Sequence, residues 1–269
     1  MFGLISLSCF DQAQVEDASE LEDLIKEIQT ERNLSLTGPN AKNVMEDKLN
    51  SILSLTEKAL ALKPNDMQAA VILYYRGWVY YNKGEYFEAI SDFSKSIELN
   101  PKKTEVFRSR AAVYMFRKEY DKAIADYSKV IDLVSTRDFG IEYFFRGNAY
   151  TTNNQYKKAI SDYDVVINLL FDRAKEVCSG KEYEKLTKEC IDREIEKILS
   201  DDSRLVMAFY GMAISLRTLG KKTEAIKSYK QLIKYGKNGI ASPVFLEIAR
   251  KGISDLGGEV DEKELDAKR

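Results

Sequence analysis

The chain has 269 residues, of which 44% are hydrophobic and 31% charged, and its formal net charge is −2. It contains no histidine, which excludes catalysis by a histidine base and metal binding through imidazole. The mixed charges give no overall basic surface for nucleic acid, and no apolar run reaches the roughly 20 residues that a transmembrane helix needs.

Residues 1–17 begin with an apolar segment, Met1 to Cys9, and then become acidic. The segment resembles the end of a bacterial lipoprotein signal, with Cys9 as the lipidated residue. However, no Lys or Arg precedes Cys9, and the apolar part is short for such a signal. We therefore expect a disordered lead in a cytoplasmic protein or, as the alternative, the remnant of a signal sequence in a lipid-anchored protein of the bacterial envelope.

Residues 18–64 carry two apolar series at helical spacing. The first runs from Leu21 to Ile28, and the second begins at Met45 and stops before Pro64. In each series the apolar residues lie three or four positions apart, which places them on one face of a helix. We therefore predict two N-terminal helices, which we interpret as a degenerate leading copy of the repeat that follows.

Three segments within residues 66–169 repeat one pattern of apolar, small and aromatic residues. The small residue on the first helix is Gly77, Ala111 or Gly147, so the copies follow at steps of 34 and 36 residues. The first copy shows the whole pattern, which is Leu73-x-x-Arg76-Gly77-x-x-Tyr80, Tyr86, Ala89-Ile90-x-x-Phe93 and Pro101. A looser fourth copy lies in residues 204–237. A period of this length indicates stacked helical hairpins, because one pair of short helices cannot bury its own apolar face.

This pattern resembles the tetratricopeptide repeat. The first copy agrees at every position of the family pattern, the second and third lack the Pro, and the fourth has Leu216 where the family has Tyr. The resemblance implies an all-α fold, a right-handed α-solenoid of helix-turn-helix hairpins. It also implies a non-catalytic scaffold with a protein or peptide partner and no cofactor. It does not name the partner, because many functions share one fold.

Each clear copy also has an Arg on its first helix and an Asp 16 residues later. The pairs are Arg76 and Asp92, Arg110 and Asp126, and Arg146 and Asp162. In the fourth copy both members are replaced together, by Met212 and Ser228. This joint loss suggests a contact between the two helices of a hairpin, although the residues could instead lie on separate solvated faces. In either case we expect a structural role.

Residues 170–203 separate the third and fourth copies and lack the repeat signature. Their apolar residues recur at helical spacing, so we predict an inserted or divergent helical segment, with insertion favoured. Cys178 and Cys190 lie in this segment and could pair. Inert thiols are the favoured interpretation, since a cysteine in a helix commonly behaves as a small apolar residue.

Two helix starts are indicated by the residues that precede or open them. Asp66 can accept a hydrogen bond from a free amide of the first turn, which predicts the N-cap of the first clear copy. Pro243 opens a predicted C-terminal capping helix at 241–256. Its apolar residues are expected to face the last hairpin, namely Val244, Ile248 and Ile253. The charged residues 257–269 predict a disordered tail.

The family resemblance also implies where a partner would bind. In the family, recurrent positions on the first helices line a concave groove. Carried onto this sequence, they give the candidate partner-binding residues Tyr74, Trp78, Tyr81, Arg108, Met115, Phe144, Asn148, Tyr210 and Arg217. Because Trp, Tyr and Arg dominate interface hot spots, Trp78, Tyr74 and Arg108 are the leading candidates. Alternatively, the N-terminal helices or the helix near 183–199 could cover these side chains.

The sequence contains no Gly-rich phosphate loop, metal-ligand cluster or nucleophile motif. We therefore predict no catalytic residue and no metal site. The leading functional hypothesis is a scaffold that binds a peptide or protein in the groove of the repeat array. A lipid-anchored bacterial envelope protein that assists assembly or secretion is the alternative, and an enzyme or a nucleic-acid binder has the least support.

Overall fold

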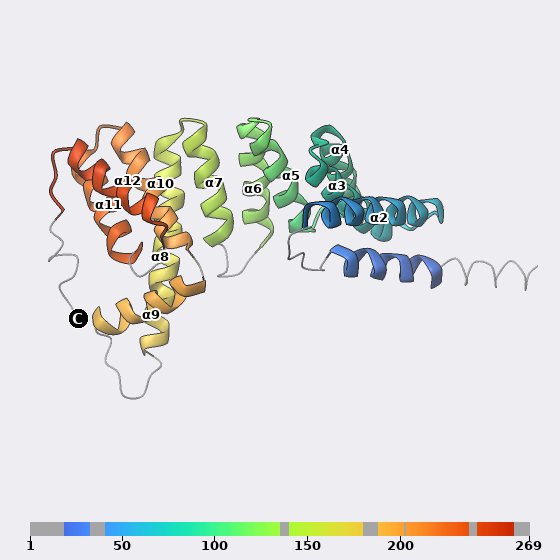
Figure 1. Ribbon diagram of the computed structural model, residues 1–269, viewed down its shortest axis with the longest axis horizontal. Helices are drawn as coiled ribbons and strands as arrows, with labels where there is room; N and C mark the ends of the chain where they lie inside the picture. Colours follow the sequence, from blue (N-terminus) through green and yellow to red (C-terminus); the bar gives the residue numbers. More distant parts are fainter. Residues whose placement is uncertain are drawn as a thin grey trace, which may run out of the picture. The chain divides into compact units, whose positions relative to one another are not determined.

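The structure of the chain, a computed structural model, describes residues 19–32, 41–134, 140–179, 188–201, 203–236 and 241–260. Every regular element within these ranges is a helix (Figure 1), so the predicted all-α class of stacked helical repeats is confirmed. The chain divides into two compact units, Met1–Glu119 and Tyr120–Arg269. The predicted lead at 1–17, including Cys9, lies outside the described residues.

Unit 1 is built around the first clear repeat. Its helices are a helix at 19–32, α2 (Ala41–Ala61), α3 (Asp66–Lys83), α4 (Tyr86–Leu99) and α5 (Thr104–Phe116). The helices α3 and α4 form the hairpin, α2 packs on α3, and α5 packs on α4. Leu21 and Ile28 of helix 19–32 join the same buried cluster as the core residues of these helices.

The start and end of α3 follow from local chemistry. Asn65 is the N-cap, because its side-chain oxygen accepts a hydrogen bond from the Gln68 backbone amide at 3.0 Å, while the Gln68 side-chain oxygen accepts one from the Asn65 backbone amide at 3.1 Å. The predicted N-cap, Asp66, is therefore wrong by one position. Asp66 is the first helical residue, where its negative charge suits the helix dipole. The helix ends at Lys83 and is followed by the C-cap Gly84, whose φ of 79° favours glycine.

In two of the hairpins, a glycine on the first helix packs against an aromatic ring of the second helix. A Cβ atom added to Gly77 would lie 2.8 Å from the Phe93 ring, and one added to Gly147 would lie 2.9 Å from the Tyr163 ring. Real Cβ atoms do not approach so closely, so in these two hairpins the helices can meet at this distance only because the small residue is glycine. This explains why the pattern pairs a small residue with an aromatic one.

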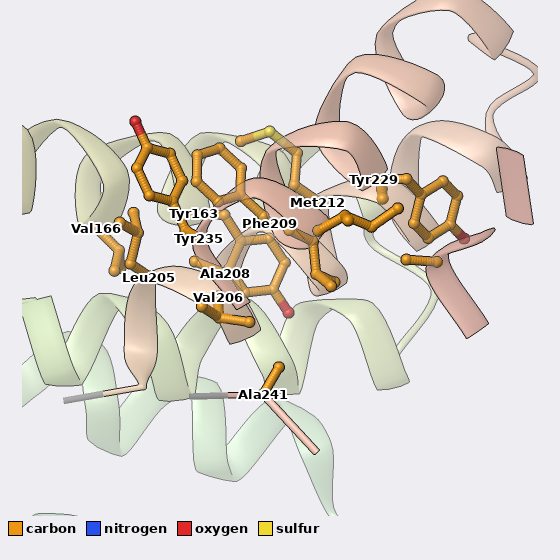
Figure 2. Close-up of a cluster of buried hydrophobic side chains, with 14 of the residues drawn as sticks. Tyr163, Val166, Leu205, Val206, Ala208, Phe209, Met212, Tyr229, Tyr235 and Ala241 are labelled. Carbon is orange, nitrogen blue, oxygen red and sulfur yellow. The ribbon is translucent and has the colours of Figure 1, made fainter. Parts of the chain in front are cut away.

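The described residues of unit 2 form two hairpins and three further helices. Its helices are α6 (Tyr120–Leu133), α7 (Gly140–Thr152), α8 (Tyr156–Ser179), α9 (Lys188–Asp201), α10 (Arg204–Thr218), α11 (Lys222–Gly236) and α12 (Pro243–Asp255). The pairs α7–α8 and α10–α11 are hairpins, and α10 also packs on α7 and α8. Figure 2 shows the buried cluster of this unit, in which Tyr163 and Phe209 lie among aliphatic side chains.

The segment between these two hairpins differs from the prediction at its start. The helix α8 continues without a break to Ser179, so the predicted boundary between 169 and 170 falls inside a helix. The reason is that Val166, Leu170 and Ala174 are all buried and follow one another at intervals of four residues, which extends the apolar stripe of α8. The helix α9 then packs on α8, and α10 packs directly on the preceding hairpin.

A disulfide joins Cys178 of α8 to Cys190 of α9, with a Cα–Cα distance of 6.1 Å. The favoured interpretation of these residues as inert thiols is therefore wrong. Cys178 is next to the last residue of α8, and Cys190 lies in the first turn of α9. Two successive helices bring these ends together in space, which a spacing of 12 residues alone does not reveal.

The C-terminal helix α12 packs on α11, but with a different face from the predicted one. Ile253 is fully buried, whereas Val244 is 62% exposed and Ile248 is also exposed. Phe245 and Ala249 lie on the buried side instead, because they precede Ile253 by eight and four residues and so share its helical face. The predicted tail also begins too early, since the Gly257 and Gly258 amides donate hydrogen bonds back to the Ser254 and Ile253 carbonyls of α12.

Candidate functional site: the first helices of the repeats

The candidate partner-binding residues of unit 1 lie on α3 and α5, the first helices of two copies. Tyr74 is only 4% exposed, so it offers almost no surface to a partner while helix 19–32 is in place. Trp78, Tyr81, Arg108 and Met115 are half-buried. The leading candidates from the sequence are therefore less exposed than expected for residues that line an open groove.

Helix 19–32 covers the first two of these side chains. The guanidinium of Arg32 lies over the rings of Tyr74 and Trp78, with its Cζ atom 5.3 and 5.6 Å from the ring centroids. Its Nη2 atom donates a hydrogen bond to the Tyr74 hydroxyl at 3.1 Å. The alternative that the N-terminal helices cover part of the predicted groove therefore holds for this portion of α3.

The C-terminal end of α3 is more open and carries an aromatic cluster. Tyr81 lies 5.7 Å from Phe116 between ring centroids, and Phe116 stacks on Tyr86 at 6.0 Å. Phe116 is 61% exposed, although the sequence pattern did not select it. Burial raises the pKa of the Tyr81 hydroxyl, and Tyr86 raises it further. The sequence pointed to Phe116 only through its position, since it is an aromatic residue at the end of a first helix and follows the candidate Met115.

In unit 2 the candidates lie on α7 and α10. Phe144 is half-buried against the core cluster. Asn148 accepts a hydrogen bond from the buried hydroxyl of Tyr163 at 2.8 Å. Burial raises the pKa of Tyr163 to about 12. Tyr210 packs edge-on against Phe245 of α12, with the ring centroids 5.1 Å apart.

Arg217 is the most exposed of the candidates in unit 2. Its Nη2 atom lies 3.7 Å from a carboxylate oxygen of Asp255 at the end of α12. Both side chains remain more than 40% exposed, so the pair is accessible to solvent and contributes little to stability. A guanidinium in this position can exchange this carboxylate for one on a partner.

The helices α7 and α10 lie side by side, although residues 153–203 separate them in the sequence. The Thr151 and Ser215 hydroxyls of the two helices are 3.3 Å apart. On α7, Phe144 and Asn148 share a helical face with Thr151, because the spacing is four and then three residues. We call the residues Phe144, Asn148, Tyr210 and Arg217 the first-helix surface of unit 2.

The Arg–Asp contacts predicted within hairpins hold these helices in place. In unit 1, Arg76 binds both carboxylate oxygens of Asp92, at 2.7 and 2.8 Å. In unit 2, Arg146 does the same with Asp162, at 2.8 Å for each bond. The prediction is confirmed for these two pairs. Arg110 and Asp126 belong to different units, so the contact between them stays a prediction.

No group of acidic or cysteine side chains within the described ranges is arranged to hold a metal ion. Among the helices that the structure describes, none combines the length and apolar character needed to cross a membrane.

Comparison with known proteins agrees with this architecture. Two family models, both for the tetratricopeptide repeat, match residues 70–103 and 207–235. No curated protein sequence matches the chain significantly.

Several solved structures share the fold. YrrB, reported as a TPR protein with an unusual peptide-binding site, has a TM-score of 0.56 and 18% identity, over 86% of this chain and 99% of that one. A crystal structure of MamA has a TM-score of 0.58 and 16% identity, over 82% and 93% of the two chains. MamA from Desulfovibrio magneticus RS-1 has a TM-score of 0.52 and 16% identity, over 79% and 96%. At these identities the likeness concerns the fold alone.

The hairpins, their small-residue contacts and these matches define an all-α protein of stacked helix-turn-helix repeats. Residues 70–103 and 207–235 are tetratricopeptide repeats, so the predicted resemblance to tetratricopeptide repeat proteins is confirmed.

Proposed function

We propose that this protein is a non-catalytic scaffold that binds a peptide or protein partner on the first helices of its repeats. The observation that carries this proposal is the first-helix surface of unit 2, where two adjacent first helices present aromatic, amide and guanidinium groups that are half-buried or exposed. Such groups combine apolar contact area with hydrogen bonding, which protein interfaces favour. The similar fold of YrrB, a TPR protein with a peptide-binding site, adds support.

The non-catalytic part of the proposal follows from the chemistry of the side chains. Two of the carboxylates that face the first helices, those of Asp92 and Asp162, are held in structural contacts with Arg76 and Arg146. The chain has no histidine to act as a base near neutral pH. Binding without a chemical step is therefore the function that this set of residues suits best.

Partner capture with tagged full-length protein tests the site in unit 2. We expect Phe144→Ala and Arg217→Glu each to weaken retention of the partner by about 2 kcal/mol, or roughly thirtyfold in Kd, because hot-spot residues lose this much on substitution. Phe87→Ala is the matched control, since Phe87 is 72% exposed but lies on α4, a second helix. Circular dichroism checks that each variant is folded. Equal retention by wild type and both site variants would remove the proposed surface.

We further propose that the protein works in an oxidising compartment, such as the bacterial envelope, rather than in the cytoplasm. The support is the Cys178–Cys190 disulfide, because structural disulfides persist mainly outside the reducing cytosol. With these two cysteines paired, Cys9 is the one remaining thiol in the sequence, which fits its proposed role as the lipidated residue. In this form the scaffold would be a lipid-anchored envelope protein that assists assembly or secretion.

Mass spectrometry of the protein from its own cells tests this location. Thiols are blocked at lysis, and the peptides are then mapped without reduction. We expect a linked peptide pair that contains Cys178 and Cys190, and a lipid-modified Cys9 at the mature N-terminus. Blocked, unlinked thiols at Cys178 and Cys190 together with an intact Met1 would place the protein in a reducing compartment instead.

A further inference from the structure

Helix 19–32 packs on the first repeat through one narrow face. Leu21 and Ile28 are buried in the core cluster of unit 1, and the half-buried Arg32 follows at the C-terminal end of the same face. The spacings of seven and four residues place all three side chains along one side of a helix. The opposite side is exposed and carries mainly acidic and polar residues.

Arg32 is held by aromatic rings rather than by a carboxylate. Its Cζ atom lies 5.3 Å from the ring centroid of Tyr74 and 5.6 Å from those of Tyr75 and Trp78. Its Nη2 atom donates to the Tyr74 hydroxyl at 3.1 Å. Within the described part of the chain, no carboxylate forms an ion pair with Arg32. Three rings and one hydroxyl therefore form a site for a guanidinium group, held by cation–π attraction.

The three ring-bearing residues belong to the same first helix that the proposed function assigns to partner binding. The contacts that Arg32 makes with them need only a guanidinium at the end of a helix, so another helix with the same pattern can make them equally well. The chain thus shows, in its own N-terminal segment, the chemistry of a ligand that fits α3.

We propose that Tyr74, Tyr75 and Trp78 form a binding site for an arginine on an amphipathic helix of the partner, and that helix 19–32 occupies this site until the partner displaces it. This inference rests on the proposed scaffold function and specifies the partner. The partner helix carries apolar residues seven positions apart and an arginine four positions after the second of them, as in Leu21, Ile28 and Arg32.

The covalent link makes helix 19–32 a strong competitor. A segment joined to its own site by a connection that spans the two, here residues 33–65, acts at an effective concentration on the order of millimolar. A free helix of equal intrinsic affinity therefore meets a site that is mostly filled. Its apparent affinity equals the intrinsic affinity multiplied by the small fraction of sites that are open. Weakening the internal helix should consequently strengthen the binding of a free one.

The sole tryptophan of the chain, Trp78, provides the measurement, because it lies directly under Arg32. A synthetic peptide of residues 19–32 is titrated into the full-length protein while Trp78 emission is followed. We expect the peptide to bind the Arg32→Ala protein about tenfold more tightly than wild type, since loss of one desolvated cation–π contact has about that effect. Ile28→Asp, which removes a buried anchor of the internal helix, should give at least the same increase.

Changes in the peptide test the arginine itself. With the Arg32→Ala protein as receptor, a peptide carrying Arg32→Ala should bind about tenfold more weakly than the unmodified peptide. A peptide carrying Glu27→Ala is the matched control and should bind unchanged, because Glu27 lies on the exposed side of the helix. Circular dichroism verifies that the receptor variants remain helical.

Two results would overturn the inference. One is that Trp78 emission in folded Arg32→Ala and Ile28→Asp proteins does not respond to the unmodified peptide. The other is that the peptides with and without the arginine bind equally. Neither result affects the capture experiment on Phe144 and Arg217, so a failure here is distinguishable from a failure of the scaffold function.

Discussion

Individual arginines connect neighbouring helices of this protein in two directions. Arg146 binds Asp162 on the second helix of its own hairpin and also donates to the Ser128 hydroxyl on α6, at 3.0 Å. Arg110 likewise donates to the Ser94 hydroxyl on α4, at 2.9 Å. Ser94 and Ser128 lie 34 residues apart, which equals one repeat step. The Asp partner could be inferred from its joint loss with the Arg, whereas the serines became recognisable only once the helices were placed.

The Arg146–Asp162 pair should contribute measurably to stability. Its side chains are only 17% and 6% exposed, and two parallel hydrogen bonds join them. In a double-mutant cycle with Arg146→Ala and Asp162→Ala, measured by urea unfolding, we expect a coupling free energy of about 1–2 kcal/mol. The exposed pair Lys95 and Glu98 is the control, and its coupling should be much smaller because solvent screens both charges. Similar couplings for both pairs would contradict this view.

Tyr163 should make the folded protein sensitive to alkali. Burial raises its pKa to about 12, whereas a tyrosine in the unfolded chain ionises near pH 10. Below pH 10 the hydroxyl is protonated in both states. Between about pH 10 and 12 only the unfolded state loses the proton, so the free energy of unfolding falls as pH rises.

Replacing Tyr163 by Phe removes this contribution. The variant should lose about 1 kcal/mol at pH 7, because the hydrogen bonds to Asn148 and Thr151 disappear. From pH 10 to 12 the free energy of unfolding should fall less steeply in the variant than in the wild type. The two slopes should differ by about 1 kcal/mol per pH unit. Urea unfolding over this range measures both slopes, and parallel slopes would show that Tyr163 is not the responsible group.

At the scale of the elements, α9 is held on two sides. The disulfide ties its first turn to α8, and Asp192 binds Lys234 of α11 through both carboxylate oxygens, at 2.8 and 2.9 Å. The Tyr235 hydroxyl donates to the same carboxylate at 3.0 Å. Burial and the negative charge of Asp192 raise the pKa of this hydroxyl. The helix therefore packs on unit 2 as a fixed element, although the repeat pattern does not account for it.

Reduction should loosen this element. We expect dithiothreitol to destabilise the wild-type protein by about 2–3 kcal/mol, since the disulfide closes a short loop in the unfolded chain. Thermal unfolding with and without the reductant measures the change. The Cys178→Ser/Cys190→Ser variant should resemble the reduced wild type and show no response to the reductant. A response of equal size in this variant would mean that the disulfide is not the cause.

Local sequence patterns located the helices but did not fully predict which face of a helix is buried or at which residue it begins. Periodicity located α12 correctly, but the choice between its two apolar faces depended on how α12 sits on α11, which left Val244 exposed. Capping placed the start of α3 within one residue, because Asn65 and Asp66 are both good caps and only Asn65 completes a capping box with Gln68. The first choice was decided by packing between helices, and the second by a local pair of hydrogen bonds.

At the scale of the whole molecule, the two units have separate buried clusters. Ile72 belongs to the cluster of unit 1 and Leu232 to that of unit 2. In helical-repeat proteins, stability is carried by contacts between neighbouring elements. A defect in one cluster should therefore be felt mainly by the helices that form it.

Hydrogen exchange can test this independence. Leu232→Ala should cost about 2–5 kcal/mol, because it leaves a cavity at a fully buried position, and should lower amide protection mainly in α10 and α11. Ile72→Ala should do the same in α3 and α4. Val244→Ala, at an exposed position, is the control and should change protection little. Equal losses in both units from either core variant would show that the clusters act as one.

The sequence by itself determined the repeat, its hairpins and the residues that join them, because a recurring pattern of small, aromatic and paired charged residues repeats the same local packing in each copy. Only the tertiary structure decided the accessibility of the candidate site, the pairing of Cys178 with Cys190 and the position of Arg32 over Tyr74 and Trp78. These features join segments with no shared periodicity. Their contacts depend on where whole helices pack, which no local pattern records.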